Sequence, residues 1–290
     1  MCTMKKKFQM IGFALSVLLV TLPVVTVGAD NAASGKQKKE KTTESALGVK
    51  PVTGSWINLA YKDVRNKYTN PQSFDNMDPK LWEAKVRELS AMGIGYLVLM
   101  EVANEGKSYY PSQIMPWWYN KDKKSPVDAI LDEAAKHNMK IFMSSGWAKD
   151  QDDNLLDPAI KERQLRIMEE LASLYKNHKA FYGWYLPVED CLCPIFAEHA
   201  VQSVNTLSEK AKKLAPGKKT LISPYGIGLS EFDNPEYEKQ MQKLKVDIIA
   251  YQDEVGCVRD QFTLPRLKKN WQRLRDIHNR LNIEMWANCE

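Results

Sequence analysis

The chain has 290 residues, 44% of them hydrophobic, and a formal net charge of +5. Residues 1–50 hold eight lysines and three acidic residues, so the 33 basic and 33 acidic residues of the remainder balance. A nucleic-acid-binding domain would carry a basic patch, and no basic run of that kind occurs after residue 50. The composition therefore excludes nucleic acid as a partner and allows one large domain with its own core.

Residues 1–29 predict a secretory signal peptide. Three lysines precede an apolar stretch from Ile11 to Val25, and Val27–Ala29 supplies small residues for cleavage. The apolar stretch is short and contains Pro23, which disfavours a membrane span; an uncleaved anchor is the alternative. Residues 30–50 are polar and lysine-rich, which is typical of a flexible tether. We therefore expect a monomer that is secreted, periplasmic or at the cell surface, with membrane contact only through the uncleaved signal.

Four cysteines remain after such a cleavage: Cys191, Cys193, Cys257 and Cys289. An oxidising compartment permits disulfides, and four cysteines allow three complete pairings. The closeness of Cys191, Cys193 and His199 hints at zinc, but no second ligand pair follows at the spacing of a zinc finger. We expect structural cysteines, free or paired, and no metal or other cofactor.

From Gly54 onward, short apolar runs alternate with polar loops and amphipathic stretches. The expected strands are Ser55–Leu59, Tyr96–Glu101, Lys140–Ser144, Phe181–Leu186, Thr220–Ser223, Asp247–Tyr251 and Ile283–Trp286. Three helices are predicted to begin at Asp78-Pro79, Ser125-Pro126 and Asp157-Pro158, each with an N-cap residue before a proline. Strands that alternate with helices predict a parallel sheet with helical crossovers.

Seven such strands predict an α/β fold of the (β/α)8 TIM-barrel type over residues 51–290, one strand short of closure. No glycine-rich phosphate loop follows the first strand, which disfavours a doubly wound nucleotide-binding sheet. Because an open barrel would leave two unpaired edges, we expect a C-terminally incomplete piece of a longer protein that unfolds easily. The alternative is a permuted or irregular barrel closed by the N-terminal segment.

Ligands of such barrels bind at the carboxyl ends of the strands, where this sequence places carboxylates, amides and aromatic rings. The predicted substrate-binding residues are Glu101, Trp117, Trp118, Trp147, Tyr225, Gln252, Asp253 and Asn288. Aromatic faces stack on sugar rings, and carboxylates and amides bond hydroxyls, whereas a phosphate would favour Arg and Lys. The strand ends therefore predict an oligo- or polysaccharide ligand.

Two of the strand-like runs end in a glutamate, Glu189 and Glu290. We assign Glu189 as the general acid/base and Glu290 as the nucleophile of a glycoside hydrolase, since two facing carboxylates are what that reaction needs. A separation of about 5 Å would predict retention of the anomeric configuration. Glu101 and Asp253 compete for the second role. The alternatives without chemistry are that Glu189 pairs with an arginine or caps a helix and that Glu290 has no role.

Further residues near these strand ends have two interpretations each. Trp117-Trp118 forms either a ligand platform or a lid packed over the barrel mouth. Asp190 is expected to be solvated or to orient Glu189, and Glu254 to be a loop residue. Near the helix ends, His278 is expected to be solvated or to bond a carbonyl group.

Several stretches together resemble one family, the domain-of-unknown-function 4434 family of secreted bacterial barrels. They are Ala91–Leu99, Phe181–Glu189, Leu221–Tyr225, Asp247–Asp253 and Trp286–Glu290. The resemblance covers residues 54–290 and implies a bacterial TIM barrel with a carbohydrate role, without an established reaction. A looser likeness to clan A glycosidases departs at Val188, where that clan usually has Asn before the glutamate.

The sequence thus favours a secreted glycosidase that acts on a glycan through Glu189 and Glu290. A non-catalytic glycan-binding protein on the same fold is the first alternative. The second is a metal-assisted hydrolase built on Glu101, Asp253 and Glu254.

Overall fold

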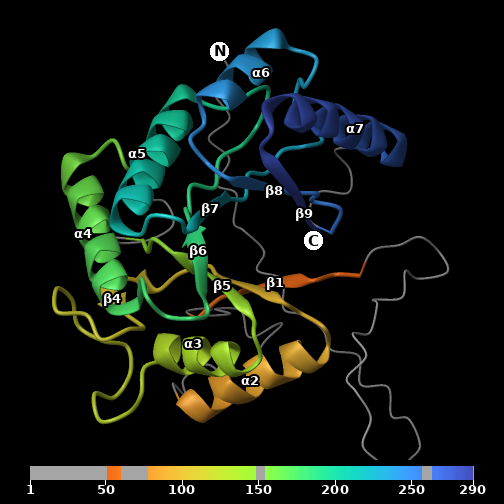
Figure 1. Ribbon diagram of the computed structural model, residues 1–290. Coiled ribbons are helices and arrows are strands. Elements are labelled where there is room, and N and C mark those ends of the chain that lie inside the picture. Colours follow the sequence, from red (N-terminus) through yellow and green to blue (C-terminus); the bar gives the residue numbers. More distant parts are fainter. Residues whose placement is uncertain (1–50, 60–77, 148–153, 257–262, 290) are drawn as a thin grey trace, which may run out of the picture.

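The computed structural model describes residues 51–59, 78–147, 154–256 and 263–289. Seven parallel strands form one curled sheet in the order β1-β2-β5-β6-β7-β8-β9 (Figure 1). The strands are β1 (Gly54–Ile57), β2 (Tyr96–Leu99), β5 (Lys140–Ser144), β6 (Phe181–Tyr185), β7 (Lys219–Ile222), β8 (Ile248–Gln252) and β9 (Glu284–Asn288). Because all strands run the same way, their carboxyl ends meet along one rim.

The connecting helices lie on the outer, convex side of the sheet (Figure 1). They are α2 (Pro79–Ala91), α3 (Pro126–Lys136), α4 (Pro158–Tyr175), α5 (Glu198–Leu214), α6 (Pro235–Lys243) and α7 (Leu264–Leu281). The N-caps predicted at Asp78, Ser125 and Asp157 are confirmed, since each side chain accepts a hydrogen bond from a backbone N–H of the first turn.

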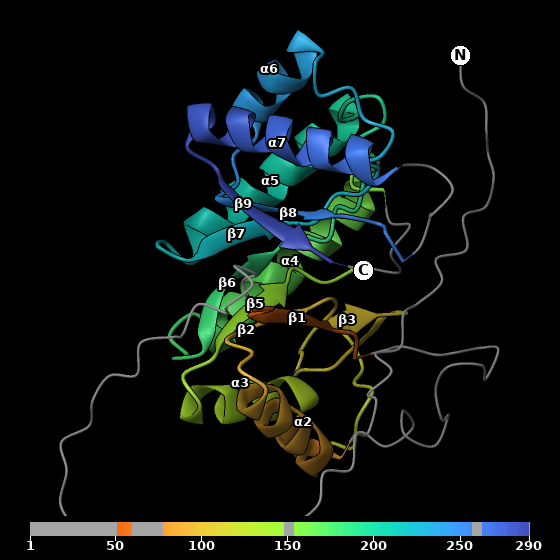
Figure 2. The same cartoon turned by 90° about the vertical axis from the view of Figure 1, so that its right-hand side faces the viewer.

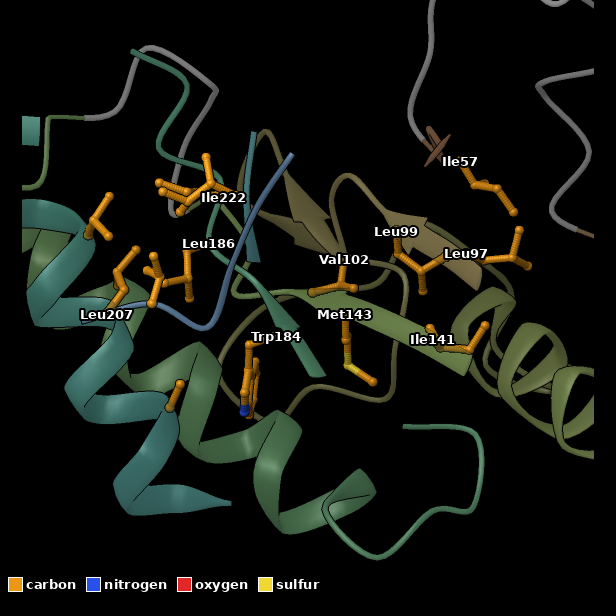
Figure 3. Packing of buried hydrophobic residues seen from close by; sticks show 14 of the residues in the cluster. Ile57, Leu97, Leu99, Val102, Ile141, Met143, Trp184, Leu186, Leu207 and Ile222 are labelled. Atoms are coloured by element: carbon orange, nitrogen blue, oxygen red, sulfur yellow. The ribbon is translucent and has the colours of Figure 1, made fainter. Parts of the chain in front are cut away.

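Two apolar layers hold this arrangement. The larger one fills the space between the outer face of the sheet and the helices, where Ile141, Met143 and Trp184 pack (Figure 3). The smaller one fills the inside of the curl and contains Phe142 and Tyr185. Neighbouring residues of one strand therefore point into different layers, as the pleat of a strand requires.

Trp286 on the edge strand β9 contacts β2 and β5 across the interior of the curl. Its ring lies 5.1 Å from that of Tyr96 on β2 and 5.6 Å from that of Phe142 on β5, both edge to face. β1 and β9 are the edge strands, and they face each other across the open side of the curl (Figure 2). The inner aromatic rings thus bridge strands that share no backbone hydrogen bonds.

A bulge interrupts the pairing of β5 with β6. Ile141 is opposite Phe181, whereas the next residue, Phe142, is opposite Gly183. The extra residue, Tyr182, packs with the inner layer. A Cβ on Gly183 would lie 2.6 Å from a ring carbon of Phe142, so this position has no room for a side chain.

All seven predicted strands are present; Lys140–Ser144 matches at both ends, and the bounds of the others differ by at most two residues. The α/β fold, with a TIM-barrel-like half-barrel sheet, confirms the predicted class. A hairpin that the sequence did not predict, β3 (Ala103–Asn104) and β4 (Lys107–Ser108), follows β2. Its turn residues Glu105 and Gly106 both have positive φ, as a tight two-residue hairpin turn demands.

Several predictions fall outside the described residues: the signal peptide, the tether, Cys257 and Glu290. Within the described ranges, Cys191, Cys193 and Cys289 are free thiols. The same ranges contain no cluster of three or more His, Cys, Asp or Glu side chains arranged to hold a metal ion. No helix in this part of the chain has the length and apolar character needed to cross a membrane.

Candidate active site

Glu189 lies just beyond the carboxyl end of β6. The strand ends at Tyr185. Pro187, two residues before Glu189, has no N–H with which to continue the pairing of the strand. The hydroxyl of Tyr185, a fully buried residue of the inner layer, donates a 2.9 Å hydrogen bond to Oε1 of Glu189. The last inward-facing residue of the strand thus fixes the carboxylate at the rim of the barrel.

Burial raises the pKa of Glu189, and the hydrogen bond from Tyr185 opposes that shift. Burial disfavours the charged form, whereas a donor to the carboxylate favours it. Among the described residues, no Lys or Arg forms an ion pair with Glu189. The next helix, α5, begins after Ala197 without any side-chain cap. Neither structural role considered for Glu189, an arginine pair or a helix cap, is therefore seen here.

Tyr225, in the loop after β7, is surrounded by acidic groups. Its pKa is raised to about 12, first by burial and then by the nearby Cys191, Asp190, Glu254 and Glu189. The phenol is half-buried. The rim of the barrel therefore gathers three carboxylates from the ends of β6 and β8 around one aromatic hydroxyl.

The loops after β6, β7 and β8 are bonded to one another. The N–H of Leu192 donates to the carbonyl of Tyr225 at 2.8 Å, and the N–H of Gly226 donates to Oε2 of Glu254 at 2.6 Å. Gly226 has φ +88°, and a Cβ there would lie 2.8 Å from Sγ of Cys191. Glu254 is indeed a loop residue, but it is buried and holds the neighbouring loop by its backbone. Burial raises the pKa of Glu254, and the backbone N–H groups of Gly226 and Ile227 oppose that rise.

The predicted polar residues of β8 and β9 meet at Ser223, which follows β7. Nε2 of Gln252 donates to the Ser223 carbonyl at 2.8 Å, and Nδ2 of Asn288 reaches its Oγ at 3.4 Å. The backbone N–H of Asp253 donates to the carbonyl of Asn288 at 3.0 Å. These contacts order the rim over three strands, so both amides stabilise it.

Glu101 follows β2 and is fully buried. Its charge contributes to the raised pKa of Tyr109 and of Tyr185, in each case after burial. Glu101 and Glu189 therefore act on the same tyrosine hydroxyl from two strands. The sequence placed both glutamates at strand ends, but it did not predict that Tyr185 lies between them.

Trp117 and Trp118 belong to the long loop between β4 and α3. Trp117 stacks on Tyr119 with ring centroids 5.1 Å apart, and its Nε1 donates to the Ser112 carbonyl at 2.7 Å. Trp118 stacks on Tyr109 at 6.1 Å. Lysine ammonium groups lie over both indoles, 5.2 Å from Trp117 and 4.4 Å from Trp118. Both rings are thus part of the packing of this loop.

A cavity of about 410 Å³ adjoins Glu189. It is lined by residues that follow β5 and β6, by residues 154–156 and Gln164 of the α4 region, and by the first two turns of α5. Trp147 lies in its wall, and Nε1 of this tryptophan reaches the Pro187 carbonyl at 3.4 Å. Of the predicted substrate-binding residues, Trp147 is therefore placed beside Glu189.

Comparison with solved structures agrees on the fold. A Bacteroides thetaiotaomicron protein described as a "putative alpha-L-fucosidase" superposes with a TM-score of 0.61 at 18% identity, over 89% of this chain and 79% of that one. A family 5 glycoside hydrolase from Bacteroides vulgatus gives 0.47 at 12% identity, over 72% and 45%. The xylanase TsXylA from Thermoanaerobacterium saccharolyticum gives 0.45 at 16%, over 72% and 69%.

At 18% identity, the likeness to the first of these proteins establishes a shared fold and not an activity. No curated protein matches the sequence. The sequence does match one family over residues 52–290, which includes every strand and helix described above. The chain therefore belongs to the family described as "Domain of unknown function (DUF4434)".

Proposed function

We propose that the protein is a glycoside hydrolase in which Glu189 is the general acid/base. The observation that carries this proposal is the environment of Glu189: a rim carboxyl group whose burial raises its pKa, held by Tyr185 and beside a cavity. A general acid must keep its proton near the working pH, and burial is the usual way to achieve this. The carboxylates, amides and aromatic rings at the same rim suit a sugar substrate.

The reaction consumes one water molecule for each glycosidic bond. Glu189 gives its proton to the bridging oxygen while the bond from that oxygen to the anomeric carbon breaks, and the leaving sugar departs as an alcohol. A second carboxylate either bonds the anomeric carbon first or takes a proton from the attacking water. We propose Glu290 for this role because it comes two residues after the end of β9 in the sequence, with Glu101 and Asp253 as the competitors.

The test is release of reducing ends from a panel of plant, host and bacterial glycans. The wild type is compared with Glu189→Gln, which keeps the shape of the side chain, and with Glu162→Gln, an exposed control on α4. We expect activity of the wild type and the control, and a loss of about 100-fold or more in Glu189→Gln. The melting temperature of Glu189→Gln should not fall, because the amide oxygen of glutamine can still accept the hydrogen bond from Tyr185.

Equal release by the wild type and Glu189→Gln would exclude Glu189 as the acid. Binding to a panel glycan without any release would replace the hydrolase by a non-catalytic glycan-binding protein. We also propose export from a bacterial cell, as the N-terminal sequence suggests; Edman sequencing of the mature protein should then begin after Ala29.

A further inference from the structure

The cavity beside Glu189 has walls of three chemical kinds. Trp147 supplies an aromatic face, Leu155 an apolar one, and Asp190 and His199 supply polar groups. Its volume of about 410 Å³ lies in the range of small-molecule sites, about 300–1,000 Å³. An aromatic wall combined with a few polar groups is what a sugar ring requires.

Hydrogen bonds between α4 and the residues after β5 hold one wall of the cavity in place. Nε2 of Gln164 on α4 donates to Oγ of Ser145 at 3.1 Å and to the Gly146 carbonyl at 2.6 Å. Gly146 has φ +79° and a Cβ there would lie 3.0 Å from Ile167, so the turn that presents Trp147 requires glycine. The cavity is therefore fixed by the ends of β5 and β6 and by α4.

Asp190 has an unused acceptor. Burial raises the pKa of its carboxyl group, and the nearby backbone N–H groups of Cys191 and Ala197 oppose that rise. Its Oδ2 is buried, and no described residue donates to it. An unsatisfied buried oxygen of this kind costs free energy, so a hydroxyl donor that enters the cavity would relieve that cost.

The charges of the walls select among sugars. Glu189 and Asp190 both line the cavity, and none of the described lining residues is Lys or Arg. A carboxylate or sulfate on the ligand would meet two acidic groups without a compensating cation, and like charges at close range cost several kcal/mol. The walls therefore suit uncharged hydroxyl donors and disfavour uronic acids.

The chemistry of Glu189 determines which part of the substrate lies here. A general acid must lie within hydrogen-bond reach of the oxygen that it protonates, and that oxygen leaves with the departing sugar. We propose that this cavity binds the leaving sugar unit, an uncharged pyranose, with Trp147 against its face and Asp190 and His199 bonded to its hydroxyls. This assignment rests on the proposed role of Glu189 as the acid.

The test measures binding by titration calorimetry and ligand-observed NMR at pH 7. The probes are matched pairs of methyl thioglycosides, glucose with glucuronic acid and galactose with galacturonic acid, which resist hydrolysis. The full chain is used as wild type, Asp190→Asn and His199→Ala, with Asp122→Asn, in an exposed loop, as the control. His199 is exposed, so His199→Ala keeps the test valid if Asp190→Asn does not fold.

We expect each neutral sugar to bind at least about tenfold more tightly than its uronic acid. In Asp190→Asn this preference should fall to about twofold or less. His199→Ala should weaken binding of the neutral sugars about three- to tenfold, the loss of one hydrogen bond, while Asp122→Asn should match the wild type. Equal binding of both members of each pair, or no effect of His199→Ala, would overturn the assignment.

Turnover separates this inference from the proposed function. If no glycan is cleaved but the binding pattern holds, the cavity is a sugar site and the hydrolase proposal fails. If cleavage depends on Glu189 while KM for a neutral disaccharide is unchanged in His199→Ala, the hydrolase stands and the cavity assignment fails.

Discussion

Tyr185 and Glu189 lie on either side of Pro187, and their hydrogen bond joins the inner layer of the sheet to its rim. Burial raises the pKa of Glu189, while the bond from Tyr185 stabilises the ionised form and lowers it. The tyrosine therefore limits how far the surroundings can shift this acid. Removing the hydroxyl should make Glu189 a weaker acid.

Tyr185→Phe should move the basic limb of the pH profile of kcat/KM to higher pH, because that limb reports loss of the Glu189 proton. The maximal rate should fall by about tenfold or less, since Glu189 itself is kept. The profile is measured beside that of Tyr182→Phe, which changes another inner tyrosine on the same strand. A limb that stays in place or moves to lower pH would contradict this account.

For single residues, the sequence predicts the position of an acidic side chain in the fold better than it predicts the contacts of that side chain. Glu189 was placed at a rim because it follows an apolar run. Its hydrogen-bond partner depends on which residues of β6 face inward, and the bulge in this strand determines which ones do. Gln252 and Asn288 were expected to face a ligand, but their partner Ser223 is 29 or more residues away along the chain. Such pairings follow from the register of the sheet, which a single sequence does not reveal.

One carboxylate on α4 holds the long loop that contains Trp117 and Trp118. Oε2 of Glu170 accepts from the hydroxyls of Tyr110 and Ser112, at 2.9 and 2.6 Å, and Oε1 accepts from the N–H of Gln113 at 2.6 Å. The loop has few regular backbone pairs of its own. Its conformation therefore depends on a neighbouring helix.

Glu170→Ala should lower the free energy of unfolding by about 1–3 kcal/mol, because three donors lose their acceptor. Amides of residues 110–118 should exchange faster while those of the sheet keep their protection. Hydrogen exchange checks this, with the exposed neighbour Glu162→Ala as the control. Unchanged exchange in the loop would show that the packing of the two indoles suffices to hold it.

A chain of hydrogen bonds joins α6, β8, α7 and the residue before β9. Nδ1 of buried His278 lies 2.9 Å from the Ile283 carbonyl, which can only accept, so this nitrogen carries the proton. Nε2 then accepts from the Tyr251 hydroxyl at 2.8 Å, and Tyr251 accepts from Tyr237 at 3.1 Å. The chain of bonds is complete only while the imidazole is neutral.

Burial lowers the pKa of His278 below its usual 6.5. The unfolded chain then binds a proton more readily than the folded one, so stability is full above pH 6.5 and falls as the pH drops below it. His278→Phe should cost about 1–3 kcal/mol at pH 7 and should lose less stability between pH 7 and pH 5 than the wild type. Urea unfolding at both pH values checks this against His199→Ala, and an equal loss in all three proteins would contradict it.

Helix starts were predictable because capping is local. Asp78, Ser125 and Asp157 bond their own first turns, and Asn234 before Pro235 follows the same rule at α6. The role of His278 was predictable only in part. Its bond to a carbonyl fits a residue in the last turn of a helix, whereas the tyrosine pair comes from the packing of other elements.

The whole sheet was predictable from the repeat of strand and helix, since each unit must place its apolar strand beside the previous one. The contact of Trp286 with Tyr96 and Phe142 was not, because it depends on how strongly the sheet curls. This contact is the direct link between β9 and the first half of the sheet. It should govern whether the molecule unfolds as one unit.

Trp286→Ala should cost about 3 kcal/mol or more, as for other large aromatic residues replaced by alanine. It should also separate unfolding into two steps, with amides of β7–β9 exposed before those of β2–β6. Urea titration followed by hydrogen exchange detects this order, and Trp271→Ala on α7 is the control for losing an indole. A single transition with equal protection in both halves would contradict the assigned role.

The bulge at Tyr182 also determines what a small change in chain length would do. Up to Phe181 the strand alternates in one phase, and from Gly183 onward in the other. Deleting Tyr182 would remove the bulge and leave the pairing on both sides of it unchanged, with Phe181 opposite Ile141 and Gly183 opposite Phe142. In the regular strand that results, Trp184 would still face the helices and Tyr185 the interior, so Glu189 would keep the hydroxyl that holds it. The bulge is thus a spare position, at which β6 can lose one residue without exchanging the side chains of the core and those of the rim.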